Sequence, residues 1–289
     1  MIDYYKNFNW KTADKLIVQS LKEDIGNGDI TSDLLIPKNK ISGANLLLKE
    51  DSVIAGLNIF RKVFELIDNN ISITIKSKDG NFYRNGKILA FIQGNTLNLL
   101  KGERVSLNIL QRMSGIANTT YLLKKRLNNN SIKIIDTRKT TPNFRIFEKL
   151  AVKIGGGENH RMGLYDMVLI KDNHINANGG IEKTLEILKQ KKIKKHIKVE
   201  IEVKDLKEFD IVQKNGKGLV DIVMLDNFRK DDIIEAIRLN RNSFVIEFSG
   251  GINYNNIINF SKIRGLDYIS SGGLTHSYKS TDIALNFII

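Results

Sequence analysis

The chain has 289 residues, 42% of them hydrophobic and only two of them proline, a composition typical of a folded globular protein and not of a disordered or linker-rich one. It contains no cysteine, which excludes disulfide bonds, zinc ribbons and thiol nucleophiles. Lysine and arginine number 45 against 32 aspartate and glutamate residues, and the net charge of +13 indicates anionic partners: nucleic acid, an anionic membrane surface, or phosphorylated and carboxylated small molecules.

The first part of the chain predicts a small unit that mixes helix and strand. Apolar residues recur at helical spacing over residues 12–24 and predict a helix that ends at Gly26. Short apolar runs separated by polar turns then predict strands at residues 44–49, 52–57, 71–77 and 87–93. From residue 97 to about residue 127 the spacing is helical again, with Gly115 expected to mark a break. We expect this long helix to connect two domains.

The rest of the chain alternates short apolar runs with amphipathic stretches. The runs predict strands at residues 132–136, 167–170, 197–202, 221–225, 244–248 and 267–270. Repeated strand–helix units predict a parallel sheet, and six or seven of them in succession favour a closed or nearly closed barrel. A doubly wound open sheet remains the second interpretation, because strand order is not visible in a sequence.

Polar residues follow every predicted strand of this second part. They are Thr137, Arg138 and Lys139; Lys171 to His174; Glu202; Asp226 and Asn227; Ser249 to Gly251; and Ser271 to Gly273. In a βα barrel the strand exits form one face, and active sites are assembled on that face. The sequence therefore predicts one site built from several strand ends.

The last two strand exits carry a pair of glycines each, in Ser249-Gly250-Gly251 and Ser271-Gly272-Gly273. Glycine allows the backbone to approach an anion closely, and barrels frequently bind phosphate after their last two strands. Either turn alone is equally well explained as an ordinary tight turn before a helix. The two turns together favour a phosphate site.

Glu200 and Glu202 alternate with apolar residues, so they share one face of a predicted strand. Taken alone, they are better explained as a solvated edge paired with nearby lysines. If the face points inward, Lys139, Lys171 or a hydrated Mg²⁺ has to compensate the carboxylates, and Asp226 on the next exit can share the metal.

Three consecutive glycines, residues 155–157, precede His160 and Arg161. Such a run costs conformational entropy, and it predicts a loop that needs positive φ or a close backbone approach. A single histidine is more often structural than catalytic, and no metal-binding spacing involves it. The feature that indicates function is the cluster of cations: Arg138, Lys139, His160, Arg161 and Lys171.

Neither nucleic acid nor a membrane is the expected partner. The densest lysine run, residues 189–195, lies between a predicted helix and a predicted strand, without the interleaved aromatic residues of a single-strand stacking platform. No stretch approaches the ~18 apolar residues of a membrane span, and the first residues lack the apolar core of a secretory signal. We expect a cytoplasmic protein that binds small anions.

Several motifs, in order along nearly the whole chain, resemble the quinolinate phosphoribosyltransferase family. They are Glu23 to Thr31, Glu103 to Asn108, Asp136 to Pro142, Gly155 to Arg161, Leu169 to His174, Ser249 to Ile252 and Leu274 to Ser277. The resemblance implies transfer of phosphoribosyl from PRPP to quinolinate, with release of pyrophosphate and CO₂, in NAD biosynthesis. It also implies a homodimer with shared active sites, and it leaves a larger assembly of dimers open.

The fold implied by the resemblance is α/β, with an N-terminal α/β open-faced sandwich followed by an incomplete (β/α) barrel of six or seven parallel strands. We expect the sandwich over residues 1–113, completed by residues 278–289, and the barrel over residues 114–277.

The resemblance also implies roles for individual residues. The quinolinate carboxylates are assigned to Arg138, His160, Arg161 and Lys171, with Arg104 reaching in from the partner subunit. The catalytic groups are Lys139, Lys171, Glu202 and Asp226, of which Lys139 and Lys171 border the PRPP site. Glu202 and Asp226 serve the ribose hydroxyls and Mg²⁺, directly or through water. The remaining substrate-binding residues are Thr137, Ser249, Gly250, Gly251, Ser271, Gly272, Gly273 and His276.

Three positions depart from the family pattern without removing a charged site residue. Asn143 stands where the family has glycine, and asparagine tolerates the left-handed backbone conformation better than most residues. Phe248 stands where the family commonly has alanine, and Ser271-Gly272-Gly273 stands where it commonly has Val-Gly-Ala.

Two alternative functions remain open. One is a molybdenum-associated or other aromatic-acid phosphoribosyltransferase of the same fold, and the other is a basic nucleic-acid-binding protein that keeps the barrel.

Overall fold

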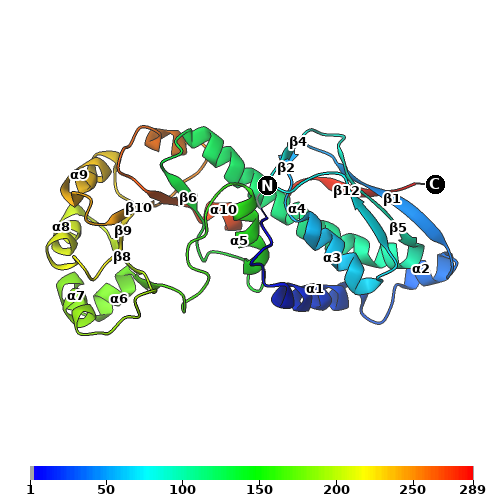
Figure 1. The fold of residues 1–289 in the computed structure, drawn as a ribbon, viewed down its shortest axis with the longest axis horizontal. Coiled ribbons are helices and arrows are strands. Elements are labelled where there is room, and N and C mark those ends of the chain that lie inside the picture. The colour runs from blue at the N-terminus through cyan, green and yellow to red at the C-terminus, as the bar shows by residue number, and fades with distance from the viewer. Residues whose placement is uncertain (1–2, 289) are drawn as a thin grey trace. The chain divides into compact units, whose positions relative to one another are not determined.

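The computed structural model describes residues 3–288 and divides into two compact units (Figure 1). The first unit contains the chain up to Tyr121, the segment Thr140–Gly156 and the chain from Leu274 on, and the second contains Leu122–Lys139 and Gly157–Gly273. The boundaries expected from sequence lay at residues 113 and 277. The compact units group residues 114–121, 140–156 and 274–277 with the first unit, so the chain passes between the units four times. The expected domain boundaries stay a prediction.

An antiparallel sheet of four strands forms the centre of the first unit, in the order β12-β1-β5-β3. Its strands are β1 (Ile41–Leu48), β3 (Ser72–Ile75), β5 (Ile88–Asn95) and β12 (Ile283–Ile288), and a separate pair joins β2 (Ser52–Val53) to β4 (Phe82–Tyr83). Residues of β1 alternate between buried and partly exposed positions, so one face of the sheet faces the core. Buried side chains of the helices, among them Phe60, Phe64 and Leu107, pack against this face.

The helices of the first unit are α1 (Trp10–Ile25), α2 (Ile30–Leu35), α3 (Leu57–Ile67), α4 (Thr96–Leu127, which continues into the second unit), α5 (Arg145–Ile154) and α10 (Gly273–His276). The predicted helix at residues 12–24 is confirmed. The strand predicted at residues 52–57 is wrong beyond Val53, because Gly56 turns the chain with a φ of 108° and α3 begins at Leu57.

The break expected at Gly115 is also wrong, since α4 runs without interruption to Leu127. A Cβ at position 115 would lie 2.1 Å from the carbonyl oxygen of Lys279. Glycine is therefore required here for a close approach of two backbones, and not to end a helix.

A parallel sheet of six strands forms the second unit, in the order β6-β11-β10-β9-β8-β7. The strands are β6 (Lys133–Ile135), β7 (Val168–Ile170), β8 (Val199–Val203), β9 (Ile222–Asp226), β10 (Val245–Ser249) and β11 (Tyr268–Ser270). All six strands predicted from the sequence are confirmed.

The sheet is an incomplete barrel, as expected. From β7 to β11 each strand lies beside the next in the sequence, without the reversal of order that defines a doubly wound sheet, and β6 and β7 remain unpaired with each other at the two edges. The helices α6 (Asp172–Ala177), α7 (Ile181–Lys189), α8 (Leu206–Asn215) and α9 (Lys230–Asn240) line the outside of the curved sheet (Figure 1). Because the strands are parallel, their carboxyl ends lie along one edge of the sheet.

Within residues 3–288, no helix combines the length and the hydropathy that crossing a lipid bilayer requires.

Candidate active site

The predicted site residues of the second unit gather at the carboxyl edge of the parallel sheet. Asp226 and Ser249 are the last residues of β9 and β10 and pair with each other in register, while Glu202 is the fourth residue of β8. Lys171 directly follows β7, and Ser271 directly follows β11. Parallel pairing brings these strand ends together, because all six strands point the same way.

Lys171 and Glu202 form an ion pair across two neighbouring strands, with 3.2 Å between Nζ and Oε2. Glu202 has a side chain only 12% exposed, and burial raises its pKa, opposed by Lys171 and reinforced by the nearby carboxylates of Asp226 and Asp172. A carboxyl group in this position is largely withdrawn from solvent and close to a second acid. It is suited to a cationic partner.

Glu200 is fully buried, so the solvated-edge interpretation of this strand face is wrong. Its Oε2 lies 2.8 Å from Nε2 of His160, whose ring is also buried. Burial raises the pKa of Glu200 to about 7, opposed mainly by a hydrogen bond with Glu247 and by the charges of Arg161 and Lys171. The alternation of acids and apolar residues in β8 therefore points its acids inward.

His160 is fixed by protein groups on three sides. Its backbone N–H donates to Oδ1 of the buried Asp136 (2.9 Å), its Nδ1 accepts from the backbone N–H of Arg161 (2.8 Å), and its Nε2 faces Glu200. Asn159 also donates to Asp136, through Nδ2 at 2.6 Å. The histidine that was predicted to hold a carboxylate thus has both ring nitrogens engaged within the protein.

Arg161 is buried and lies close enough to Arg138 for the two positive charges to interact. Its pKa is lowered, mainly by burial and then by Arg138, while Glu200 and Asp166 oppose the shift. One terminal nitrogen donates to the carbonyl of Met167 at 3.3 Å, but no acceptor among the described residues reaches the buried Nε–H. An unfilled donor beside a second guanidinium favours an anionic ligand.

Lys139, the remaining member of the predicted cation cluster, is exposed, and its backbone N–H donates to the hydroxyl of Thr137 at 3.0 Å.

The glycine loop before His160 has the close backbone approach and the positive φ that the sequence predicted. A Cβ at Gly155 would lie 2.3 Å from the carbonyl oxygen of Ala117, and Gly156 has a φ of 89°. Asn143 has a φ of 65°, the left-handed conformation that asparagine tolerates.

The two late glycine turns are joined to each other. Ser271 Oγ donates to the carbonyl of Ile252 at 3.1 Å. Gly250 and Gly251 have positive φ values of 140° and 53°, and a Cβ at Gly250 would lie 2.4 Å from Oδ1 of Asn227. The first turn therefore needs glycine for geometric reasons, whereas a Cβ at Gly273 in the second turn would make only an ordinary contact, 3.5 Å from Oγ of Ser271.

The helices expected after these turns are short. After the first turn a 3₁₀ segment begins only at Ile257, and after the second turn α10 has four residues, Gly273–His276. Anion binding at these turns would depend on backbone N–H groups of the turns themselves, because so short a helix has little dipole.

Two predicted residues lie in the first unit. Arg104 is exposed on α4, and His276 is exposed at the end of α10 with Nδ1 2.6 Å from Oγ of Ser277. Their assignments to substrate stay predictions.

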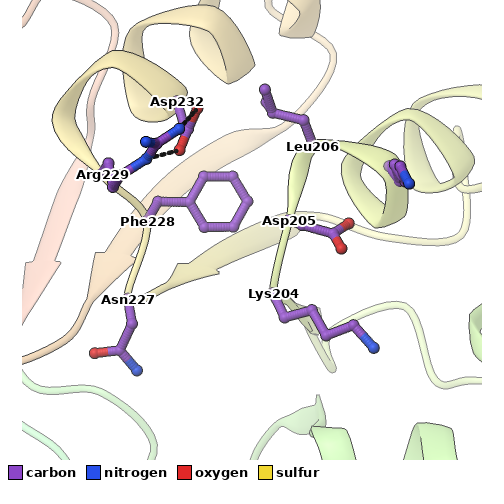
Figure 2. A pocket seen from close by; sticks show the side chains of 8 residues that line it. Lys204, Asp205, Leu206, Asn227, Phe228, Arg229 and Asp232 are labelled. Carbon is purple, nitrogen blue, oxygen red and sulfur yellow. Dashed lines mark hydrogen bonds and ion pairs between the residues drawn. The ribbon is translucent and has the colours of Figure 1, made fainter.

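A hollow of about 300 Å³ lies beside this edge, between the starts of α8 and α9 (Figure 2). Several of its charged groups are paired within the protein: Arg229 binds Asp232, Lys204 pairs with Glu208, and Asp205 accepts from the backbone N–H of Glu208. Phe228 occupies the centre of the view between these groups (Figure 2). None of the predicted substrate-binding residues lines the hollow, and we do not assign the reaction to it.

Sequence reasoning missed Glu247 of β10 and Asp136 beside β6. Both are fully buried, Glu247 lies 3.7 Å from Nε2 of His160, and Asp136 anchors the backbone of His160. The signal was present, because Glu247 is the one charged residue in the apolar run of residues 244–248. An acid inside a buried strand requires a specific partner.

Comparisons with known proteins agree over almost the whole chain. The profile of the quinolinate phosphoribosyl transferase N-terminal domain matches residues 29–114, and that of its C-terminal domain matches residues 116–286. A probable nicotinate-nucleotide pyrophosphorylase (carboxylating) of Bacillus subtilis is 40% identical over 272 residues, covering 94% of this chain and 92% of its own. The mitochondrial decarboxylating quinolinate phosphoribosyltransferase 2b of Nicotiana tabacum is 40% identical over 282 residues, covering 92% and 79%.

Solved structures agree with the fold. The nicotinate-nucleotide pyrophosphorylase of Francisella tularensis has a TM-score of 0.90 at 36% identity and covers 100% of both chains. The NadC structure of Streptococcus pyogenes has a TM-score of 0.90 at 37% identity, covering 96% of this chain and 98% of its own.

Proposed function

This chain belongs to the quinolinate phosphoribosyltransferase family, and we propose that the carboxyl edge of its parallel sheet transfers phosphoribosyl from PRPP to quinolinate. The products are nicotinate mononucleotide, pyrophosphate and CO₂, and the reaction belongs to NAD biosynthesis. The observation that carries this proposal is the buried guanidinium of Arg161, with its unfilled Nε–H and the second charge of Arg138 beside it.

Quinolinate suits this corner because it carries two adjacent carboxylates. Two guanidinium groups in a partly desolvated place repel each other until a ligand brings negative charge, and a planar carboxylate matches the hydrogen-bonding edge of arginine. Lys171 adds a further positive charge near this site: it lies close enough to Glu200 to lower the pKa of that acid, and it forms an ion pair with Glu202. A neutral base would add no negative charge to that of Glu200 and Asp166, which already oppose this repulsion at Arg161.

The phosphoribosyl donor is assigned to the other side of the edge. The two glycine turns offer backbone N–H groups to its 5′-phosphate, and Glu202 and Asp226 accept hydrogen bonds from the ribose hydroxyls. Lys139, which is exposed, and Lys171 stabilise the departing pyrophosphate by charge. The carboxylates at Glu202 and Asp226 also offset the positive charge that develops on the ribose as the bond to pyrophosphate breaks.

Glu202 and Asp226 fit a magnesium ion by their chemistry. Both offer carboxylate oxygen, the ligand that Mg²⁺ prefers, and they are close enough for Asp226 to raise the pKa of Glu202. A bound Mg²⁺ would neutralise charge on the pyrophosphate. Lys171 Nζ, 3.2 Å from Oε2 of Glu202, would hold this carboxylate in place.

We further propose that the enzyme is cytoplasmic and acts as a homodimer in which Arg104 of one subunit reaches the quinolinate site of the other. The exposure of Arg104 on α4 is compatible with contact to a second chain.

The direct test is a reaction of the purified full-length chain with quinolinate, PRPP and Mg²⁺, followed by chromatography of the nucleotide product. We expect nicotinate mononucleotide and equimolar CO₂, and loss of turnover with EDTA that Mg²⁺ restores. Nicotinate in place of quinolinate is the matched control, because it lacks one carboxylate. Turnover of nicotinate but not of quinolinate would sink the assignment.

A further inference from the structure

A buried cluster of one histidine and two acids lies under the candidate quinolinate site. His160 Nε2 lies 2.8 Å from Glu200 Oε2 and 3.7 Å from Glu247 Oε2. The three side chains are 8%, 0% and 1% exposed. They come from the glycine loop, β8 and β10, so the cluster joins three separate parts of the second unit.

The hydrogen bonds determine where the proton of His160 lies. Because the backbone N–H of Arg161 donates to Nδ1, this nitrogen carries no proton. The proton of the neutral ring is then on Nε2, where it points at Glu200. His160 is therefore held as one neutral tautomer and not as a free cation.

One neutral donor, the hydroxyl of Ser270, lies near the carboxyl group of Glu247 and acts to lower its pKa. By distance and angle, neither carboxyl oxygen of Glu247 accepts a hydrogen bond from the described residues, and Glu200 Oε1 is also unfilled. An ionised acid in this position would be a buried charge without a partner, which is strongly unfavourable. Burial and the neighbouring Glu200 accordingly raise the pKa of Glu247 to about 8.

We propose that Glu247 is a positioning residue: in its protonated form it donates to Glu200, which orients the Nε2–H of His160 so that Nδ1 fixes the backbone of Arg161. This inference rests on the proposed function in that Arg161 binds quinolinate. Glu247 acts through two other residues and does not touch the substrate.

The charged and titratable groups around the cluster are consistent with a single net negative charge on the acid pair. Arg161, Lys171 after β7 and Glu202 on β8 act on Glu200, and Tyr268 on β11 interacts with Glu247. Asp136 beside β6 holds the backbone of His160, and Arg138 lies near Arg161. A shared metal ion is the competing explanation, since the three ligand atoms lie within 4.8 Å of one another. The separation of 2.8 Å between Nε2 and Oε2 is that of a hydrogen bond, and one nitrogen cannot hold both a proton and a metal.

The first test is ¹⁵N NMR of the full-length protein with labelled histidine. The chain has four histidines, and single substitutions of the exposed ones, His174→Asn, His196→Asn and His276→Asn, identify the signal of His160 by elimination. We expect an unprotonated Nδ1 and a protonated Nε2 from about pH 6 to pH 8, where an ordinary histidine titrates. A doubly protonated ring, or a shift on adding Zn²⁺ that EDTA reverses, overturns the proposal.

The second test compares three variants in the quinolinate reaction. Glu247→Gln keeps a neutral donor of the same shape, and we expect kcat/KM within about threefold of the parent, because the bond to Glu200 is kept. Glu247→Ala releases His160, and a displaced Arg161 lowers kcat/KM by about 100-fold through a higher KM for quinolinate, with the KM for PRPP little changed. Glu235→Gln, an exposed acid on α9, is the control.

The two variants of Glu247 distinguish a neutral acid from a carboxylate. Equal losses in Glu247→Gln and Glu247→Ala refute the proposal, because an ionised acid would then be required. If Glu247→Ala does not fold, the activity of Glu247→Gln and the NMR signal of His160 still decide. If the parent protein does not turn over quinolinate, the proposed function fails, whereas the NMR measurement decides the proton arrangement independently.

Discussion

Removing the carboxyl group of Glu148 should destabilise the first unit more than any exposed ion pair does. Glu148 lies on α5 with a fully buried side chain, and its partner Arg112 on α4 is 21% exposed. Arg112 Nε donates to Glu148 Oε1 at 2.8 Å, and the backbone N–H of Thr141 donates to Oε2 at 3.1 Å. The guanidinium also lies over the ring of Tyr278, 4.7 Å from its centroid.

The magnitude follows from the burial of the acid. Breaking a buried pair by removing one partner costs about 3–5 kcal/mol, because the remaining charge is left uncompensated. With about 2–4 °C per kcal/mol for a chain of this size, Glu148→Ala should lower the thermal midpoint by about 6–20 °C. The loss should also reach activity, because Thr141, whose backbone N–H would lose its acceptor, lies two residues after the site residue Lys139.

The assay is differential scanning calorimetry of the parent, Glu148→Ala, Arg112→Ala and the double variant. The two single losses should not add, since they remove the same interaction. Glu235→Ala, which removes an exposed acid paired with Arg238, is the control and should leave the midpoint unchanged. A shift below about 2 °C for Glu148→Ala would show that the buried pair contributes little and would refute the reasoning.

Three other outcomes can be measured. Arg138→Ala should lower kcat/KM for quinolinate by about 100-fold or more. The circular dichroism spectrum and the thermal midpoint should stay near those of the parent, because Arg138 lies at a strand exit. A large loss of stability contradicts that placement. Gly115→Ala should lower the free energy of unfolding, measured in urea, by about 1–3 kcal/mol, although alanine has the better helix propensity. The reason is that its Cβ would meet the backbone of Lys279. A gain in stability contradicts this clash. Burial raises the pKa of Glu247 from its ordinary 4.5 to about 8. Between these two pH values the native chain binds more protons at this residue than the unfolded chain does. The free energy of unfolding should therefore fall as pH rises from about 4.5 to about 8. Glu247→Gln should flatten that fall, and an unchanged pH profile in the variant contradicts it.

The strands of the second unit could be predicted from sequence because each is a short apolar run bounded by polar residues. The helix α3 was not predicted, because its first residue, Leu57, was assigned to a strand that in fact ends at Val53. The extent of the first unit was also not visible, since the assignment of residues 140–156 depends on contacts such as that between Glu148 and Arg112.

For the site, residue types and order were enough to predict which strand ends carry charge, but not which face of a strand is buried. Glu200 could not be placed, because its partner His160 lies 40 residues away and only the fold brings them together. The same applies to Glu247, whose protonation depends on a neighbour two strands away in the sheet. Which of these acids are buried is decided by the fold and cannot be read from the spacing of residues in the sequence.

The pairing of β12 with β1 has a consequence for synthesis of the protein. Leu46 of β1 lies opposite Leu285, so its neighbour on that side is made almost 240 residues later. While the ribosome produces the whole parallel sheet, β1 has an open edge that can pair with another nascent chain. Completion of the antiparallel sheet has to wait for the final strand, and we expect late steps of folding, not early ones, to limit the yield of native protein.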